Sequence, residues 1–349
     1  MSKRLGIKLA GFLWALSMMY PVYAQEGGNS LSLQAEARVD YQAEYIDGNK
    51  IKPNTGFKGK YLNVILNGTI GHSFSYAYRQ RLNKAHADQS FFDATDWLYL
   101  TYHAGTRWEL SAGKQVVNIG GYEYDRAPID LYFCSEYWNN IPCYQFGVSA
   151  AYVANDGKDK FIAQLCESPF QANADDMYAY NLMWYGSHGS LSTIYSLNLI
   201  EYLPGKYISY IALGNQFQWG RFRLQFDFMN RATDQHTFFF KDCSVMSELQ
   251  WNANDYLDIF AKVTYDVNKS HAVGDYCVMP GTELTRIGGG LEFYPLTKKN
   301  RNIRLHANYS YTTGRNGNEA GALIDKQSFV DVGLKWKIDI LSYANKILK

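Results

Sequence analysis

Apolar and polar residues alternate one by one along many short segments of this chain. In segment 30–46, SLSLQAEARVDYQAEYI, the odd-numbered positions are apolar and the even-numbered positions are nearly all charged or polar. Segments 221–230, 255–266, 302–312 and 328–340 repeat this alternation. Because successive side chains of a β-strand point to opposite faces, a period of two predicts strands with one apolar and one polar face.

The alternating segments divide the chain into about 16 strands. The predicted strands are 30–46, 60–68, 72–82, 94–103, 107–117, 144–153, 159–167, 177–185, 191–202, 206–217, 221–230, 244–251, 255–266, 284–294, 302–312 and 328–340. The connections expected to be long are 47–59, 83–93, 118–143, 168–176, 231–243, 267–283 and 313–327. The connections between these are short and rich in Gly, Asn and Asp, which tight hairpin turns need. Connection 203–206 is short where a long loop is expected.

Two kinds of all-β protein show this alternation. A soluble β-sandwich or β-helix buries its apolar faces in a core, whereas a transmembrane barrel turns them to lipid and encloses its polar faces. Long connections on one side and short turns on the other are typical of outer-membrane barrels. We therefore predict an all-β fold, a transmembrane antiparallel β-barrel of about 16 strands with long outer loops and short periplasmic turns.

The first 24 residues differ from the rest of the chain. They begin with basic residues, continue in a short apolar run and end in Val22-Tyr23-Ala24, a small-residue cleavage pattern. This arrangement is typical of a secretory signal peptide, and the apolar run is short for a membrane-spanning helix. We expect a signal peptide at 1–24, a barrel at 25–349, and a location in the outer membrane of a Gram-negative bacterium, in contact with lipid.

Composition and motifs narrow the function. The 34 basic and 33 acidic residues give a net charge of +1, which excludes a basic nucleic-acid-binding surface. The sequence lacks the G-x-S-x-G, H-E-x-x-H and P-loop motifs, and no His–Ser pair indicates an outer-membrane lipase. We expect neither enzymatic activity nor a cofactor.

The five cysteines have no C-x-x-C spacing, so we expect no metal site. Disulfides are permitted in an exported chain. A disulfide between Cys134 and Cys143 would close a small loop within 118–143. Cys243 and Cys277 could form a second disulfide, and Cys166 would then have no partner.

One stretch of the chain contains a recognisable series of elements. In chain order these elements are Asp93-Ala94, the turn Ala104-Gly105-Thr106, Gly113-Lys114 and, after a long connection, Gly147-Val148. The series resembles the phosphate-selective porin O and P family of outer-membrane porins. The resemblance implies a barrel with the predicted strand count, a homotrimer, and a loop after the fifth strand that folds inward as a constriction. Our independent strand count also places connection 118–143 after the fifth strand.

The polar faces of the strands carry the residues that would line a pore. The basic residues expected there are Arg38, Arg79, Arg81, Arg107, Arg221, Arg223, Lys262, Arg286, Arg304 and Lys335. Acidic residues on the same faces nearly balance them. Guanidinium groups bind carboxylate and phosphate oxygens, and basic rings favour anions in pores. In the alternative interpretation these arginines pair with lumenal acids and hold the wall in shape.

The expected constriction loop, 118–143, is acidic and aromatic. Its candidate site residues are Tyr124, Asp125, Arg126, Asp130, Tyr132 and Glu136. Arg126 is its only basic residue, which disfavours phosphate selectivity. We therefore predict an outer-membrane porin, a water-filled channel for passive diffusion of small hydrophilic solutes, with anions as one class. The alternative is a surface barrel that binds a ligand or partner through its loops without open conductance.

Overall fold

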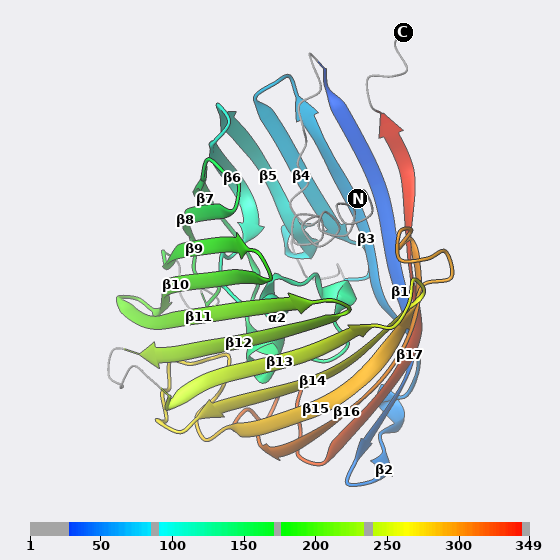
Figure 1. Ribbon diagram of the computed structural model, residues 1–349. Helices are drawn as coiled ribbons and strands as arrows, with labels where there is room; N and C mark the ends of the chain where they lie inside the picture. The colour runs from blue at the N-terminus through cyan, green and yellow to red at the C-terminus, as the bar shows by residue number, and fades with distance from the viewer. Residues whose placement is uncertain (1–27, 85–90, 171–175, 234–239, 344–349) are drawn as a thin grey trace.

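The chain forms one antiparallel sheet that closes on itself. The computed structural model describes residues 28–84, 91–170, 176–233 and 240–343, so the expected signal peptide lies outside the described residues. The first strand, β1 (Ser30–Ile46), pairs along its whole length with the last strand, β17 (Gln327–Tyr343) (Figure 1). This pairing closes the barrel and leaves no open sheet edge, which a lipid environment requires.

Sixteen long strands make the wall, and the predicted fold class is confirmed. The two-residue strand β2 (Asn49–Lys50) only extends the first hairpin. The other strands are β3 (Gly56–Ile70), β4 (Phe74–Arg81), β5 (Thr95–Ala104), β6 (Trp108–Val116), β7 (Tyr144–Val153), β8 (Asp159–Glu167), β9 (Tyr178–His188), β10 (Leu191–Leu203), β11 (Lys206–Trp219), β12 (Phe222–Thr233), β13 (Asp242–Asn252), β14 (Leu257–Asn268), β15 (Glu283–Phe293) and β16 (Ile303–Arg315).

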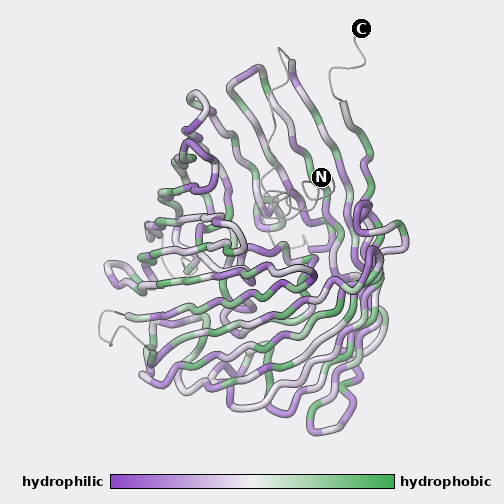
Figure 2. The backbone as a smooth tube through the Cα atoms, in the orientation of Figure 1, coloured by the Kyte–Doolittle hydropathy of each residue, from purple (hydrophilic) through white to green (hydrophobic). Residues whose placement is uncertain are grey.

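Side chains alternate between the two faces of the wall. On β14, Ile259 and Val263 are exposed, whereas the neighbouring Asp258 and Lys262 are only 1% and 4% exposed. Figure 2 shows hydrophobic and hydrophilic residues interleaved along the strands. The outer face is therefore apolar and the inner face polar, which is the distribution of a transmembrane barrel and the reverse of a soluble β-sandwich.

The connections differ in length at the two ends of the strands. Tight turns such as 105–107 and 189–190 alternate along the chain with longer connections such as 117–143 and 269–282. The expected exception is present, because Pro204 and Gly205 alone join β10 to β11. Gly205 has a φ of 71°, a left-handed conformation that glycine adopts without steric cost.

In the part of the chain that the structure describes, helical segments are few and short. They are η1 (Lys52–Asn54), η2 (Phe91–Ala94), α2 (Tyr122–Asp125), η3 (Pro128–Asp130) and α3 (Glu136–Asn140). Among the residues that the structure describes, no helix is long and apolar enough to cross a membrane. The last three lie in one connection between β6 and β7, and α2 packs against β11 and β12 (Figure 1).

Candidate pore and the segment inside it

The connection of residues 117–143, here named the lumenal segment, contacts inward-facing side chains of β12 to β17 and of β1. Two wall carboxylates bind the N-termini of its helices. Asp227 on β12 accepts hydrogen bonds from the backbone N–H groups of Tyr122 (2.8 Å) and Glu123 (2.7 Å). Asp266 on β14 accepts one from the N–H of Glu136 (2.7 Å). These carboxylates satisfy N–H groups that have no partner within a helix, and they favourably meet the positive end of its dipole.

The start of α2 lies very close to the wall. Gly121, which precedes α2, has a φ of 107°. A Cβ atom at Gly214 on β11 would lie 2.8 Å from Gly121 Cα, a contact too short for real side chains. The segment therefore needs glycine at both positions to approach β11 and β12 this closely.

Ion pairs fasten the middle of the lumenal segment. Arg126 donates to both carboxylate oxygens of Glu248 on β13, at 3.0 and 2.7 Å, and to Gln225 Oε1 at 2.6 Å. Burial alone would lower the pKa of Arg126, but Glu248 raises it above its ordinary value. Such a bidentate pair fixes orientation as well as position.

Asp130 forms ion pairs with two basic residues on neighbouring strands. Arg304 Nη1 on β16 lies 2.7 Å from its Oδ1, and Lys335 Nζ on β17 lies 2.6 Å from the same atom. Burial would raise the pKa of Asp130, but Lys335 and Arg304 outweigh it and hold the pKa well below its ordinary value. Asp130 therefore stays ionised over the physiological pH range.

Three more contacts complete the attachment. Lys262 Nζ lies 2.7 Å from Glu123 Oε1 and donates to the Phe133 carbonyl at 2.8 Å. The Tyr132 hydroxyl donates a hydrogen bond to Glu292 Oε1 at 2.6 Å. Arg38 donates to the Leu131 carbonyl at 2.5 Å. Three of the predicted pore-lining bases, Lys262, Arg304 and Lys335, thus pair with carboxylates of the lumenal segment.

The predicted basic residues divide into two groups in the structure. Those at inward-facing strand positions are Arg38, Arg79, Arg81, Arg223, Lys262, Arg286, Arg304 and Lys335. Arg107 and Arg221 are instead exposed residues in short turns, so their prediction as pore-lining residues is wrong. Each lies one residue before its strand begins, because the alternating sequence pattern extends one residue beyond the strand.

The candidate residues of the lumenal segment differ in exposure. Tyr124 and Glu136 are buried; Tyr124 packs in an apolar cluster and Glu136 accepts from Asn316 at 2.9 Å. Asp125, Arg126, Asp130 and Tyr132 are partly exposed. Burial raises the pKa of Asp125, which accepts a hydrogen bond from the Tyr185 hydroxyl at 2.9 Å.

The expected disulfides are absent. All five cysteines are free, so the Cys134–Cys143 prediction and the Cys243–Cys277 alternative are wrong. Cys134 precedes α3 and is buried beside Lys262, whereas Cys143 follows α3 and its thiol donates to the Ile141 carbonyl. Helix α3 thus separates the two thiols into different surroundings. Burial raises the pKa of Cys134 to about 12 and that of Cys143 to about 11.

The sequence did not reveal that part of the interior is an apolar core. Ile119 and Tyr137 of the lumenal segment pack there with Ile200 on β10 and Tyr210 on β11. The inward positions of β6 and β7 include small polar residues that are partly exposed, Ser111 and Ser149, beside the buried Gln115 and Ala151. The interior is therefore asymmetric, packed at β10 and β11 and less filled at β6 and β7.

Two arginines on β4 share one carboxylate. Arg79 Nε and Arg81 Nε lie 2.7 and 2.8 Å from oxygens of Asp96 on β5. The Arg79 guanidinium stacks 3.7 Å from the centre of the Trp97 ring and donates to the Tyr144 hydroxyl at 2.5 Å. This group carries two positive charges against one negative charge.

Comparison with known proteins agrees with this architecture. Residues 32–191 match the model of the family described as phosphate-selective porin O and P. No curated relative matches the sequence. The anion-selective porin of Comamonas acidovorans superposes with a TM-score of 0.64 at 14% identity, over 89% of this chain and 100% of that chain. The trimer form of OmpT from Vibrio cholerae gives 0.62 at 12% identity, over 89% and 100%.

The outer-membrane channel DcaP of Acinetobacter baumannii also gives a TM-score of 0.62 at 12% identity, over 89% of this chain and 98% of that chain. At these identities the likeness shows the fold alone. The family match favours a channel over an enzyme. The chain is a porin-type β-barrel of the bacterial outer membrane, and its residues 32–191 match the phosphate-selective porin O and P family, as the sequence resemblance predicted.

Proposed function

We propose that the protein is a porin through which small hydrophilic solutes diffuse passively across the outer membrane. The observation that carries this proposal is a closed barrel with an apolar outer face and a charged, polar inner face. The family match of residues 32–191 supports it. A polar inner face suits a water-filled passage, because polar side chains that face the passage can form hydrogen bonds with water.

We assign the aqueous path to the side of the lumen formed by β3 to β7. Small or polar inward side chains that are partly exposed there include Asn67, Ser75, Ser111 and Ser149. The lumenal segment occupies the opposite side, where its contacts with β12 to β17 support a role as the constriction of the channel. A homotrimer is part of the proposal, because the family resemblance implies it and the OmpT structure is a trimer form.

Anions are the solutes that the path favours. Arg79 and Arg81 stand on this side of the lumen with one shared carboxylate, Asp96, and leave an excess of one positive charge. The Arg81 side chain is 19% exposed and lies within reach of the Tyr61 ring, at 5.9 Å. A guanidinium at such a position attracts carboxylate and phosphate oxygens without a preference for phosphate.

Planar-bilayer recording tests the proposal. The purified protein is expected to produce stepwise ohmic conductance, and its reversal potential in a KCl gradient should indicate anion preference. Arg81→Gln should reduce the anion-to-cation permeability ratio, whereas Arg221→Gln, a matched change at an exposed turn, should leave it unchanged. A folded barrel without conductance would overturn the porin assignment and favour a surface barrel that binds its ligand through loops. Equal ratios in wild type and Arg81→Gln would overturn the anion assignment alone.

A further inference from the structure

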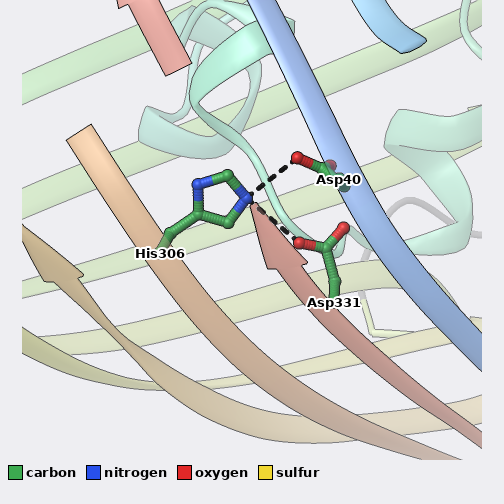
Figure 3. Close-up of side chains that lie close together, drawn as sticks. All are labelled: Asp40, His306 and Asp331. Carbon is green, nitrogen blue, oxygen red and sulfur yellow. Dashed lines mark hydrogen bonds and ion pairs between the residues drawn. The ribbon is translucent and has the colours of Figure 1, made fainter. Parts of the chain in front are cut away.

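Three ligating side chains meet at the seam where the barrel closes. Asp40 on β1, Asp331 on β17 and His306 on β16 come from three adjacent strands (Figure 3). His306 Nε2 lies 3.1 Å from Asp40 Oδ1 and 3.1 Å from Asp331 Oδ1. One ligand atom from each residue lies within 4.8 Å of the other two, and the side chains are at most 1% exposed. We propose that this cluster binds a divalent transition-metal ion.

His306 Nε2 faces two carboxylate oxygens at once. A neutral imidazole has one N–H, which cannot serve two carboxylates fully. On either side of Asp331 in the strand register stand Gln42 on β1 and Asn308 on β16. Gln42 Oε1 and Asn308 Oδ1 are buried and have no hydrogen-bond donor among the described residues. Asn308 Nδ2 donates to Asp331 Oδ1 at 3.2 Å, so one of these amides contacts the cluster directly. Buried acceptors without donors are costly, and a cation suits such surroundings.

Arg38 contacts both carboxylates of the cluster and so orients them toward the proposed ion. Its Nε lies 2.8 Å from Asp40 Oδ2 and its Nη2 lies 3.2 Å from Asp331 Oδ2. The guanidinium thus contacts both carboxylates, donating to Asp331 Oδ2 and to Asp40 Oδ1, and the Oδ1 atoms of both carboxylates also turn to His306. Groups that form hydrogen bonds with metal-binding side chains commonly hold those side chains in the orientation that the metal needs. The two carboxylates still exceed Arg38 by one negative charge.

The opposing strand leaves room for the three ligands. Gly333 on β17 pairs with Asp40 on one side and with His306 on the other. A Cβ atom at this position would collide with Asp40 Oδ1 and with His306 Nε2. Glycine is therefore the residue that lets the carboxylate and the imidazole converge in front of the strand.

The donor set selects the kind of metal. Imidazole nitrogen together with carboxylate oxygens suits Zn²⁺ and its first-row neighbours, whereas Mg²⁺ and Ca²⁺ use oxygen ligands. Zinc bonds of about 2.0–2.2 Å put tetrahedral ligand atoms roughly 3.3–3.6 Å apart. The two spacings from His306 Nε2 are 3.1 Å and need only a small adjustment, and all three ligand atoms lie within 4.8 Å of one another. A bound ion would join β1 to β16 and β17, and so clamp the seam of the barrel.

Metal titration of the folded barrel tests this site. After treatment with EDTA, the wild-type protein in detergent should bind one Co²⁺ per chain with visible ligand-field absorption, and Zn²⁺ should displace it. His306→Gln should weaken Co²⁺ binding at least 100-fold. His103→Gln is the matched control, because His103 also faces inward, on β5, and bonds to Ser75 away from the cluster; it should bind like the wild type. Zn²⁺ should raise the thermal unfolding temperature of the wild type and not of His306→Gln.

Folding of each variant is checked by its heat-modifiable migration on a gel. If His306→Gln does not fold, Asp331→Asn takes its place with the same expected loss of Co²⁺ absorption. Wild-type protein without Co²⁺ absorption, or a folded ligand variant that binds as tightly as the wild type, would overturn the proposal. The cluster would then be a hydrogen-bonded lock in which His306 bridges the two carboxylates without a metal ion.

Discussion

Breaking the Arg126–Glu248 pair should release the lumenal segment without unfolding the barrel. The two side chains are 15% and 5% exposed and share two hydrogen bonds of 3.0 and 2.7 Å. Removing one partner of a buried pair costs about 3–5 kcal/mol, because the other charge stays buried and unpaired. Since about 1.4 kcal/mol corresponds to a factor of ten, Arg126→Ala should raise the population of the detached segment about 100-fold or more.

The assays are single-channel conductance and limited proteolysis of the folded protein in detergent. Arg126→Ala and Glu248→Ala should both give larger or noisier conductance steps and faster cleavage between β6 and β7, and the exchanged pair Arg126→Glu/Glu248→Arg should recover part of the wild-type behaviour. Asp156→Asn is the matched control, because it removes an exposed ion pair with Lys158 in a turn. Arg126→Ala with wild-type conductance and cleavage rate would refute the assignment of the segment as a constriction held by wall charges.

Three further predictions concern the thiols, the lipid face and the helix caps. Alkylation in denaturant without reductant should label every cysteine, whereas brief treatment of the folded protein at pH 7 should leave Cys134 unlabelled; a mass spectrum showing a disulfide would contradict this. Leu182→Arg, on the outer face near the middle of β9 and 57% exposed, should lower the unfolding free energy by about 2–4 kcal/mol, measured by urea titration in lipid vesicles. Asp227→Asn should speed cleavage of the lumenal segment, because the amide is a weaker acceptor for the N–H groups of α2; an unchanged cleavage rate would count against the capping role.

The wall of the barrel was predictable because each strand repeats one local rule. The predicted segment 255–266 corresponds to β14 (Leu257–Asn268), and the shift of two residues leaves its apolar face unchanged. The predicted segment 60–68 begins too late, since β3 starts at Gly56. Residues Gly56 to Gly59 pair with β1 but carry two glycines, so they show little alternation.

The interior was not predictable, because its contacts join residues far apart in the chain. Asp227 and Asp266 look in the sequence like ordinary wall acids. Their partners in the lumenal segment stand 105 and 130 residues earlier. No local pattern indicates such a pairing. The cysteine prediction failed for the same reason, because the spacing of Cys134 and Cys143 does not show that α3 forms between them.

These contacts change how the charges of the wall are expected to act on a passing ion. Asp130 and Glu292 together balance Arg304 and Lys335, and Glu123 balances Lys262, so these bases do not act on a passing solute as free charges. A tally of wall residues therefore overestimates the field in the channel. Only locally unbalanced groups contribute strongly, because paired charges cancel beyond a few ångströms. By this argument the two arginines that share Asp96 should influence ion preference more than Lys262, Arg304 and Lys335.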